Sequence, residues 1–344
     1  MAALVAVLVG TGGTLAANRT ADAAPALSAP ANTATKALSA ARVAEQLDRG
    51  LVAVPADGGT LVTWRMFGDD PEGVSFRLYR DGELIEETLK TNYLDSGGSS
   101  SSTYEIRAVV DGTEQPGEEA GVWGSGRLDI PLRKPAGGST RDGVAYAYSA
   151  NDTSAGDLDG DGQYELVVKW VPSNATDVAN SGTCTGPTVF DAYELRGRLL
   201  WRVNLGTNVR SGSHYDSFQV FDYDRDGKAE VAVRTSDGSK DAAGAVIGDG
   251  NASHLAGNCA VISGAEYLSV FNGENGNVMD SVPFEPARGS VADWGDTWGN
   301  REGRLLSATA YLDGTKPSMV FTRGIYERTA LAAYDWNGSH LTRR

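Results

Sequence analysis

An acidic loop followed by an apolar strand occurs twice in this chain, and this repeat limits the possible folds more than any other feature. The first copy covers residues 155–169 and the second covers residues 220–234. A third, decayed copy at residues 308–321 keeps the shape but loses most of its acidic residues. Internal repetition of this kind is the sequence signature of repeat architectures.

A strand–turn–strand element alternates with these loops, and its three copies carry aromatic residues at matching positions: Tyr193, Phe271 and Tyr334. Together the two elements supply four short strands per repeat, which is typical of a β-propeller. We therefore expect an all-β chain in which residues 134–344 form an incomplete β-propeller. Because a propeller closes its ring with about four or more blades, three units indicate a truncated chain or a partner that completes the ring. Truncation is the favoured interpretation.

Carboxylates stand at alternating positions of the repeated loop, as in Asp157, Asp159 and Asp161. Oxygen ligands in this array suit Ca²⁺, which takes about six to eight of them. An EF-hand is excluded because Val168 and Val233 occupy the position where that loop needs a glutamate. The predicted Ca²⁺ ligands are Asp152, Asp157, Asp159, Asp161, Gln163 and Glu165 for the first loop and Asp222, Asp224, Asp226, Lys228 and Glu230 for the second.

The alternative to a metal site is a pair of solvated acidic turns with side-chain hydrogen bonds to the backbone. This alternative is disfavoured because three unpaired carboxylates so close together repel one another without a cation. A structural role, in which the metal holds the repeats in register, and a catalytic role are both compatible with the loops.

Residues 41–133 show a different pattern, in which apolar and polar residues alternate as in half-buried strands. Such runs occur at residues 61–65, 76–80 and 104–110, and Asp81 with Gly82 indicates a tight turn. This pattern predicts a small β-sandwich close to a fibronectin type III module. Modules of this kind pack, space or bind, and the unit carries no catalytic motif.

Residues 1–40 are expected to be a signal or leader segment followed by a linker. Residues 2–9 form a short apolar run, and residues 21–23 fit a small-residue cleavage site. No basic residue precedes Arg19, so either the signal is weak or the true start lies upstream, and a disordered leader is the alternative. We predict a secreted, extracellular protein.

The chain has 344 residues and a formal net charge of -15, from 30 basic and 45 acidic side chains. This charge argues against nucleic acid or an anionic membrane surface as a partner, and no stretch is long and apolar enough to span a bilayer. An acidic chain would also repel an anionic polysaccharide unless cations intervene. Cys184 and Cys259 are compatible with a disulfide in an exported chain, and equally with two free buried thiols.

Several motifs follow one another in a collinear order from about residue 42 to the last residue. They are the stretches 148–170, 172–174, 200–206, 210–215, 235–238 and 294–301 in the repeats, and 47–53 and 75–82 in the N-terminal unit. Together they resemble the family 11 rhamnogalacturonan lyases. The resemblance implies an eight-bladed propeller with bound Ca²⁺ and cleavage of the rhamnose–galacturonate backbone of pectin by β-elimination. The implied partner is the polysaccharide rhamnogalacturonan I, and we expect a monomer.

The implied chemistry agrees with an acidic, cation-binding chain. β-Elimination removes the proton at C5 of galacturonate, next to a carboxylate. A cation that neutralises this carboxylate makes the proton more acidic and reduces repulsion from the protein. A basic side chain must then take the proton, and the sequence leaves that catalytic base unassigned.

The predicted substrate-binding residues are Asn151, Lys169, Arg210 and His214, each of which has a structural alternative. Asn151 also fits an Asx turn before a strand, and Lys169 also fits a salt bridge to a neighbouring loop. Arg210 and His214 could reach sugar or hold their loop. Relatives carry an aspartate tied to the active site where this chain has Val171, and an apolar side chain there can neither ligate metal nor hydrogen-bond sugar.

Two further predictions concern the motif at residues 294–301 and the tryptophans. Asp296 and Arg301 are expected to pair with each other as a clamp between blades. Trp170, Trp294 and Trp298 could stack on sugar faces, but burial in the core is the expected role.

Two other functions compete with an exported lyase. A non-enzymatic Ca²⁺-binding propeller fragment that binds carbohydrate or protein is favoured by Val171 and by the lack of the family's later histidine-containing motifs. A glycoside hydrolase is a weaker alternative, because its mechanism needs two carboxylates flanking the bond and nearly all the clustered acids are assigned to metal.

Overall fold

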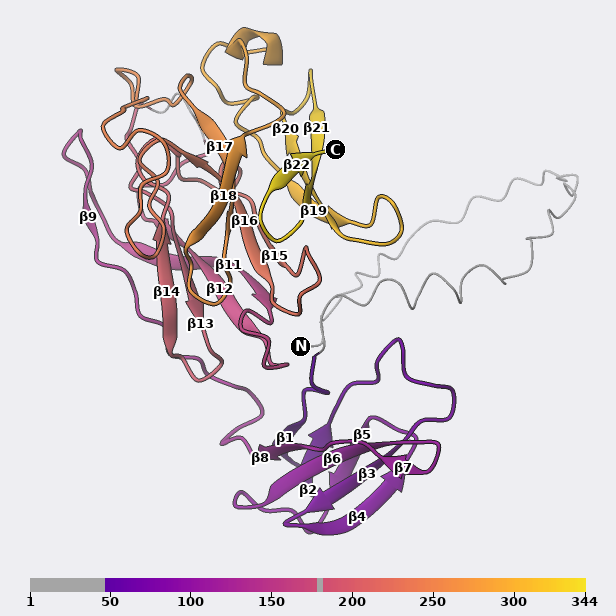
Figure 1. Cartoon of the computed structure of the whole chain (residues 1–344). Coiled ribbons are helices and arrows are strands. Elements are labelled where there is room, and N and C mark those ends of the chain that lie inside the picture. Colours follow the sequence, from indigo (N-terminus) through magenta and orange to yellow (C-terminus); the bar gives the residue numbers. More distant parts are fainter. Residues whose placement is uncertain (1–46, 178–181) are drawn as a thin grey trace, which may run out of the picture.

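The computed structural model describes residues 47–177 and 182–344 (Figure 1). Across these ranges the chain is all-β, and one 3-10 turn, η1 (Val291–Trp294), is the only helical element. The predicted all-β class is therefore confirmed. The predicted leader at residues 1–40 lies outside the described residues. Within the described ranges, no helix combines the length and apolar character needed to cross a membrane.

The N-terminal unit consists of two β-sheets whose inner faces share one core. Phe76 and Leu78 are buried on this inner face, whereas Arg77 between them lies on the outer face, which is the predicted alternation. The first sheet has the order β1-β2-β5 and the second β4-β3-β6-β7, with β8 also paired to β6. The bounds are β1 Val52–Ala56, β2 Gly59–Thr63, β3 Ser75–Arg80, β4 Glu83–Thr88, β5 Asn92–Asp95, β6 Thr103–Val110, β7 Thr113–Glu114 and β8 Glu118–Gly121.

The repeat region consists of three four-stranded antiparallel sheets, each formed by consecutive strands (Figure 1). A two-stranded ribbon, β9 (Gly138–Ser139) with β10 (Ala145–Tyr146), precedes them. The first sheet contains β11 Tyr148–Gly156, β12 Glu165–Pro172, β13 Val189–Tyr193 and β14 Leu199–Asn204. The second contains β15 Phe218–Phe221, β16 Glu230–Ser236, β17 Glu266–Phe271 and β18 Val278–Pro283. The third contains β19 Ser307–Ala310, β20 Ser318–Arg323, β21 Ala330–Trp336 and β22 Leu341–Arg343.

The predicted equivalence of the three repeats holds at the level of strand register. Tyr193 pairs with the second residue of β12, Phe271 with the second residue of β16, and Tyr334 with the second residue of β20. All three aromatic side chains are buried. The second strand of each sheet is almost fully buried, as expected for a strand covered on both faces.

Two hydrophobic clusters join neighbouring sheets of the repeat region. Phe190 and Trp201 from the first sheet pack with Phe271 from the second. Leu268 of the second sheet packs with Phe321 of the third in the other cluster. Burial of such large side chains provides the main favourable free energy of sheet-on-sheet association, so the three sheets form one stacked body.

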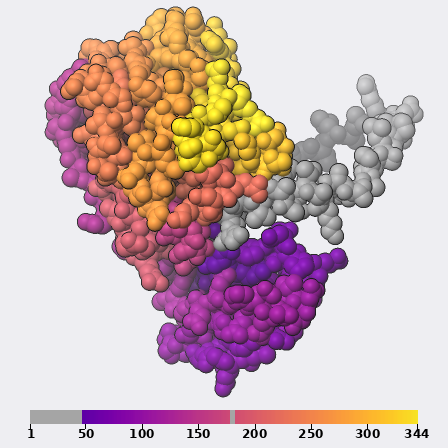
Figure 2. Space-filling model, in the orientation of Figure 1, coloured from indigo at the N-terminus to yellow at the C-terminus, as the bar shows by residue number. Residues whose placement is uncertain are grey.

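The N-terminal unit contacts the repeat region at the first acidic loop. The backbone N–H of Asp48 donates to the carbonyl oxygen of Gly162 at 2.8 Å, and the Arg65 guanidinium lies 5.3 Å from the centre of the Tyr164 ring. Figure 2 shows this unit, in indigo and purple, lying against the magenta part of the repeat region. The first acidic loop therefore belongs to the interface between the two parts of the chain.

A disulfide between Cys184 and Cys259 joins two segments that are distant in sequence, with the Cα atoms 4.9 Å apart. Cys184 lies between β12 and β13, and Cys259 lies in the long connection between β16 and β17. Of the two states compatible with the sequence, the structure therefore has the disulfide. It links the first and second sheets of the repeat region.

Candidate metal loops and substrate residues

The first acidic loop connects β11 to β12 and is held by side-chain hydrogen bonds to its own backbone. Asp157 accepts hydrogen bonds from the N–H groups of Gly160 and Gly162, at 2.7 and 2.9 Å. Glu165 accepts one from the N–H of Leu158 at 2.8 Å. Both glycines have positive φ, 83° and 89°, a conformation that glycine adopts without steric cost. The loop therefore turns tightly enough to bring its carboxylates together.

The second acidic loop, between β15 and β16, repeats this arrangement. Asp222 accepts hydrogen bonds from the N–H groups of Arg225 and Gly227, at 2.6 and 3.0 Å. Glu230 accepts one from the N–H of Tyr223 at 2.9 Å. The two loops thus have the same hydrogen-bond pattern at equivalent positions of the repeat, which agrees with the repeat seen in the sequence.

Each loop gathers three carboxylates from the predicted ligand sets. In the first loop, one oxygen each from Asp157, Asp159 and Glu165 lies within 4.8 Å of the others. The second loop matches this cluster with its own three carboxylates, those of Asp222, Asp224 and Glu230. None of the six has a lysine or arginine ion-pair partner in the part of the chain that the structure describes. Converging oxygen ligands without a countercharge fit a hard divalent cation such as Ca²⁺.

Burial and repulsion between neighbouring carboxylates raise the pKa values of several of these carboxyl groups. Burial raises the pKa of Glu165 to about 7, that of Asp222 to about 6 and that of Glu230 to about 9, and neighbouring carboxylates add to each shift. Burial also raises the pKa values of Asp159 and Asp224. Such shifts are the cost of placing like charges together away from water, and a bound cation would remove that cost.

The third copy of the loop has lost the carboxylates that converge in the first two copies. Alanine, leucine and serine occupy the three ligand positions, as Ala310, Leu312 and Ser318. The Lys316 ammonium pairs with the Asp335 carboxylate at 3.2 Å in this region. The third loop therefore lacks the three-carboxylate set that the first two loops share.

Other predicted ligands lie beside the clusters. Asp161 and Asp226 use their carboxylates to accept backbone hydrogen bonds from Gln163 and Lys228, at 2.8 and 2.9 Å. The Lys228 ammonium pairs with Glu274 at 3.0 Å. A cationic side chain cannot ligate a metal, so Lys228 could contribute only its backbone carbonyl oxygen.

Asp152, which was predicted as a ligand of the first loop, is not among the three carboxylates that converge there, and its role as a ligand stays a prediction. Asp152 sits at an irregularity of β11, where the register with β12 shifts between Ala150 and Thr153. Its side chain is 63% exposed, and its carboxylate lies 3.2 Å from the Lys169 ammonium. Asp152 therefore has a cation partner within the protein.

Lys169 is buried and does not present its ammonium to solvent, contrary to the predicted substrate contact. Its Nζ lies 2.6 Å from Asp216 Oδ1, and the two side chains are 1% and 0% exposed. Burial lowers the pKa of Lys169, but the Asp216 carboxylate outweighs this and raises it above its ordinary value. Thr188 also donates a hydrogen bond to Asp216. The salt-bridge alternative for Lys169 is therefore the one that the structure has.

Arg210 is likewise buried, and its contacts fit the loop-holding alternative, while the substrate contact stays a prediction. Its guanidinium donates to the carbonyl oxygen of Cys259 at 3.3 Å and lies 6.0 Å from the centre of the Tyr215 ring. Burial lowers its pKa. The side chain thus supports the segment around the disulfide.

His214 and Asn151 are the two predicted substrate residues whose side chains reach solvent. The His214 side chain is 41% exposed, and its Nδ1 lies 3.3 Å from Asp177 Oδ1 and 2.7 Å from Arg304 Nη1. Asn151 is exposed beside the irregularity of β11. Of the four predicted residues, these two can contact a ligand without rearrangement.

The remaining motif residues have structural partners. Asp296 accepts backbone hydrogen bonds, including one from Arg301, but the Arg301 guanidinium pairs with Glu327 at 2.8 Å. The predicted clamp between the two side chains is therefore wrong. Trp170 and Trp294 are buried as expected, whereas Trp298 is 43% exposed.

The partners of Lys169 and His214 could not be predicted from the sequence. Asp216 directly follows the stretch 210–215, and its signal was indirect: a lysine within an apolar strand requires a nearby countercharge. Asp177 and Arg304, which flank His214, lie in different connections and share no local motif with it.

Comparison with known proteins identifies the family. The sequence model described as rhamnogalacturonan lyase family 11, C-terminal domain, matches residues 127–344. The model described as rhamnogalacturonan I lyases beta-sheet domain matches residues 42–123. Two proteins of Bacillus subtilis (strain 168) are similar: the rhamnogalacturonan endolyase YesW is 52% identical over 311 residues, and the rhamnogalacturonan exolyase YesX is 49% identical over 307 residues. The alignments cover 90% and 88% of this chain, but only 50% of each relative.

Solved structures agree with the sequence matches. The crystal structure of YesW superposes with a TM-score of 0.85 at 52% identity, covering 88% of this chain and 52% of that chain. The rhamnogalacturonan lyase PL11 of Bacillus licheniformis superposes with a TM-score of 0.84 at 51% identity, with the same coverage of 88% and 52%. The fold and the sequence together define the family, which is one of polysaccharide lyases. The chain belongs to rhamnogalacturonan lyase family 11, and it spans about half the length of the curated relatives that it matches.

Proposed function

We propose that this chain is part of a secreted, pectin-degrading rhamnogalacturonan lyase. It acts as a monomer on rhamnogalacturonan I and cleaves the rhamnose–galacturonate backbone by Ca²⁺-assisted β-elimination. Support comes from family membership and from two relatives named as rhamnogalacturonan lyases, one an endolyase and one an exolyase. The observation that carries the Ca²⁺ dependence is the pair of equivalent three-carboxylate clusters without countercharges.

We also propose that the three four-stranded sheets are consecutive blades of a β-propeller. Their consecutive strand order and their shared register support this proposal. We further propose that the two-sheet N-terminal unit is a fibronectin-III-like sandwich, which its shared inner core supports. In this arrangement the Ca²⁺ loops hold neighbouring strands at a fixed angle, which is the structural role left open by the sequence.

The exposed residues define what this chain contributes to substrate binding. Ca²⁺, when bound, neutralises nearby carboxylates and makes a proton next to a uronate carboxylate more acidic. Asn151 offers an amide to sugar hydroxyl or carboxylate oxygens. Because Arg304 donates toward Nδ1 of His214, a neutral ring carries its proton on Nε2 and acts as a hydrogen-bond donor. His214 therefore suits substrate binding better than proton abstraction, and the base remains unassigned.

Export is supported by the disulfide between Cys184 and Cys259, because disulfides persist in oxidising compartments outside the cytosol. Secretion also agrees with an extracellular polymer as the substrate. The test is to express the chain with its own first 46 residues and to measure its distribution between medium and cells. Protein retained in the cytosol in reduced form would contradict the proposal.

The enzymatic proposal is tested by incubating the chain with rhamnogalacturonan I and following the ultraviolet absorbance of the unsaturated uronate product. We expect a rise that requires Ca²⁺ and stops when a chelator is added. The matched control is polygalacturonan, which has uronates but no rhamnose. A Ca²⁺-independent rise, or an equal rise on the control polymer, would contradict the proposed reaction.

A second candidate function, a non-enzymatic Ca²⁺-binding module that binds carbohydrate, is favoured by one observation. Val171 in β12, opposite Ser149 of β11, places an apolar side chain near the exposed Asn151. If this candidate holds, the chain binds rhamnogalacturonan I in a Ca²⁺-dependent sedimentation assay without forming product. Product formation by the unaltered chain would exclude it.

A further inference from the structure

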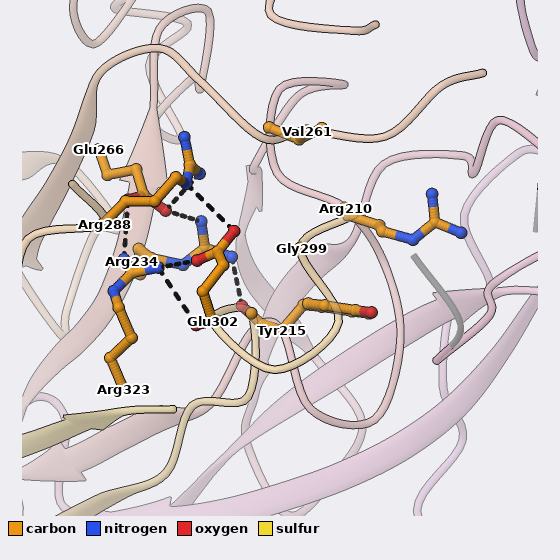
Figure 3. A pocket seen from close by; sticks show the side chains of 10 residues that line it. Arg210, Tyr215, Arg234, Val261, Glu266, Arg288, Gly299, Glu302 and Arg323 are labelled. Carbon is orange, nitrogen blue, oxygen red and sulfur yellow. Dashed lines mark hydrogen bonds and ion pairs between the residues drawn. The ribbon is translucent and has the colours of Figure 1, made fainter. Parts of the chain in front are cut away.

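A small cavity lies inside a buried cluster of charged side chains between the second and third sheets. Its volume is about 20 Å³, which is room for roughly one water-sized particle. The cluster contains Arg234, Arg288 and Arg323 together with Glu266 and Glu302, and all five side chains line the cavity. Figure 3 shows the guanidinium groups and the two carboxylates converging, while Arg210 lies apart from them.

The cluster carries more positive than negative charge. Three guanidinium groups face two carboxylates, so one positive charge is unbalanced. Every member is at least nine-tenths buried, with side-chain exposures between 1% and 8%. The arginines outweigh burial and lower the pKa of Glu266 to about 2, so that carboxyl stays ionised at neutral pH. Because an unbalanced charge in a buried site is costly, the cluster favours an anion beside it.

Two of the arginines also have N–H groups directed to no protein acceptor. Arg234 uses its Nη atoms on Glu266 and on the carbonyl oxygen of Tyr215, but its Nε has no hydrogen-bond partner within the described ranges. Arg288 Nη2 lies 2.8 Å from Glu266, but Nη1 of the same group has no such partner. A buried donor without an acceptor costs free energy, and both arginines line the same cavity.

We propose that this cavity binds a monatomic anion, with chloride as the physiological ligand. A water molecule would accept hydrogen bonds but would leave the excess charge in place. Sulfate, phosphate or a sugar carboxylate would have to place several heavy atoms among the five charged side chains. A halide supplies an acceptor and one negative charge in the volume available. This site is independent of the acidic loops, so the proposal of a bound anion can be tested separately from the proposed lyase function.

The cluster connects segments that carry the candidate substrate residue. Arg234 belongs to β16 and donates to the carbonyl of Tyr215, which directly follows His214. Arg323 ends β20 and holds Glu302, which precedes Arg304 by two residues. Bound chloride therefore stabilises the packing of the second sheet against the third and, through it, the position of His214.

The experiment is thermal unfolding of the full chain in sodium chloride and in sodium gluconate at constant ionic strength. We expect chloride to raise the melting temperature saturably, by about 2–4 °C at roughly tenfold excess over the dissociation constant. Bromide should act similarly. Arg288→Met removes the excess charge and one free donor, and should abolish the dependence. The matched control is Arg301→Met, a surface arginine paired with Glu327, which should keep it.

A second measurement does not depend on any variant. Crystals of the unaltered chain grown in sodium bromide should show an anomalous bromine peak in the cavity, within hydrogen-bond distance of Arg234 Nε and Arg288 Nη1. A water molecule in the cavity with no anomalous signal would overturn the proposal. An equal response to chloride in the Arg288→Met and Arg301→Met chains would overturn it as well.

Discussion

Lys169 Nζ lies 2.6 Å from Asp216 Oδ1, and both side chains are buried. Neither residue could keep its charge in this position alone, because an isolated buried ion loses its hydration without compensation. The Lys169 ammonium also pairs with Asp152 at 3.2 Å, and the Asp152 side chain is exposed at the surface. A buried ion pair thus fixes the irregular part of β11 that carries Asn151.

Breaking this pair should destabilise the chain strongly. We expect Lys169→Met or Asp216→Asn alone to lower the free energy of unfolding by about 3–5 kcal/mol, because the first leaves the buried Asp216 carboxylate without its lysine and the second leaves the buried Lys169 ammonium with only the exposed Asp152. The double variant should recover a large part of the loss. Urea unfolding of the three variants and the unaltered chain gives the coupling free energy. Additive losses would show that the two residues act independently.

Removing Ca²⁺ should make stability depend on pH in a definite direction. The folded-state pKa values of Glu165 and Glu230, about 7 and about 9, lie above that of an unfolded glutamate. Between the pKa of an unfolded glutamate and these folded-state values, the metal-free folded state binds more protons than the unfolded state. The stability of the metal-free chain therefore falls as pH rises from about 5 to about 9. With Ca²⁺ bound this slope should disappear.

The measurement for this pH effect is the melting temperature across that pH range, in excess chelator and in excess Ca²⁺. The control is Lys316→Met, which alters the third loop, where no carboxylate cluster exists. A chelated chain whose stability rises with pH would contradict the proposed protonation of the loops.

A single substitution should have opposite effects on the metal-free and metal-bound chain. Glu230→Gln removes a carboxylate that is buried among like charges, so we expect the chelated chain to become more stable at pH 8. In Ca²⁺ the same variant should become less stable than the unaltered chain, because a ligand is lost. Asp313→Asn in the third loop serves as the matched control. Destabilisation of equal size in both conditions would indicate a purely structural role for Glu230.

Loss of the disulfide should also be costly. Replacing Cys184 and Cys259 with serine opens a cross-link between residues 75 positions apart, and we expect a loss of about 2–5 kcal/mol in the free energy of unfolding. Thiol titration of the unaltered, unfolded chain should find no free thiol. Two titratable thiols would show that the pair is reduced in the isolated protein.

The parts of this molecule that could be predicted from sequence are those determined by neighbouring residues. The repeated strands are recognisable because their burial follows local patterns, so Tyr193, Phe271 and Tyr334 could be aligned before their contacts were known. The carboxylates of each acidic loop also converge through turns that are short and rich in glycine. Local spacing is sufficient in both cases.

The roles that the sequence could not decide belong to residues whose partners are distant in sequence. The sequence shows Lys169 and Arg210 as basic residues in family motifs. It does not show that both side chains are buried, with Lys169 paired to Asp216 and Arg210 hydrogen-bonded to the carbonyl oxygen of Cys259. Asp152 likewise appears close to the first loop in sequence, whereas the irregularity of β11 turns it toward Lys169. Tertiary contacts decide which polar residues remain available for ligands.

The most direct test of the account is calorimetric titration of the metal-free chain with Ca²⁺. The two equivalent carboxylate clusters predict one high-affinity site in each loop, with protons released on binding at pH 7 because Glu165 and Glu230 give up theirs. Glu165→Gln and Glu230→Gln should each weaken one site, and the double variant should lack both. Binding that persists unchanged in the double variant, or that releases no protons, would contradict the assignment of the metal to these loops.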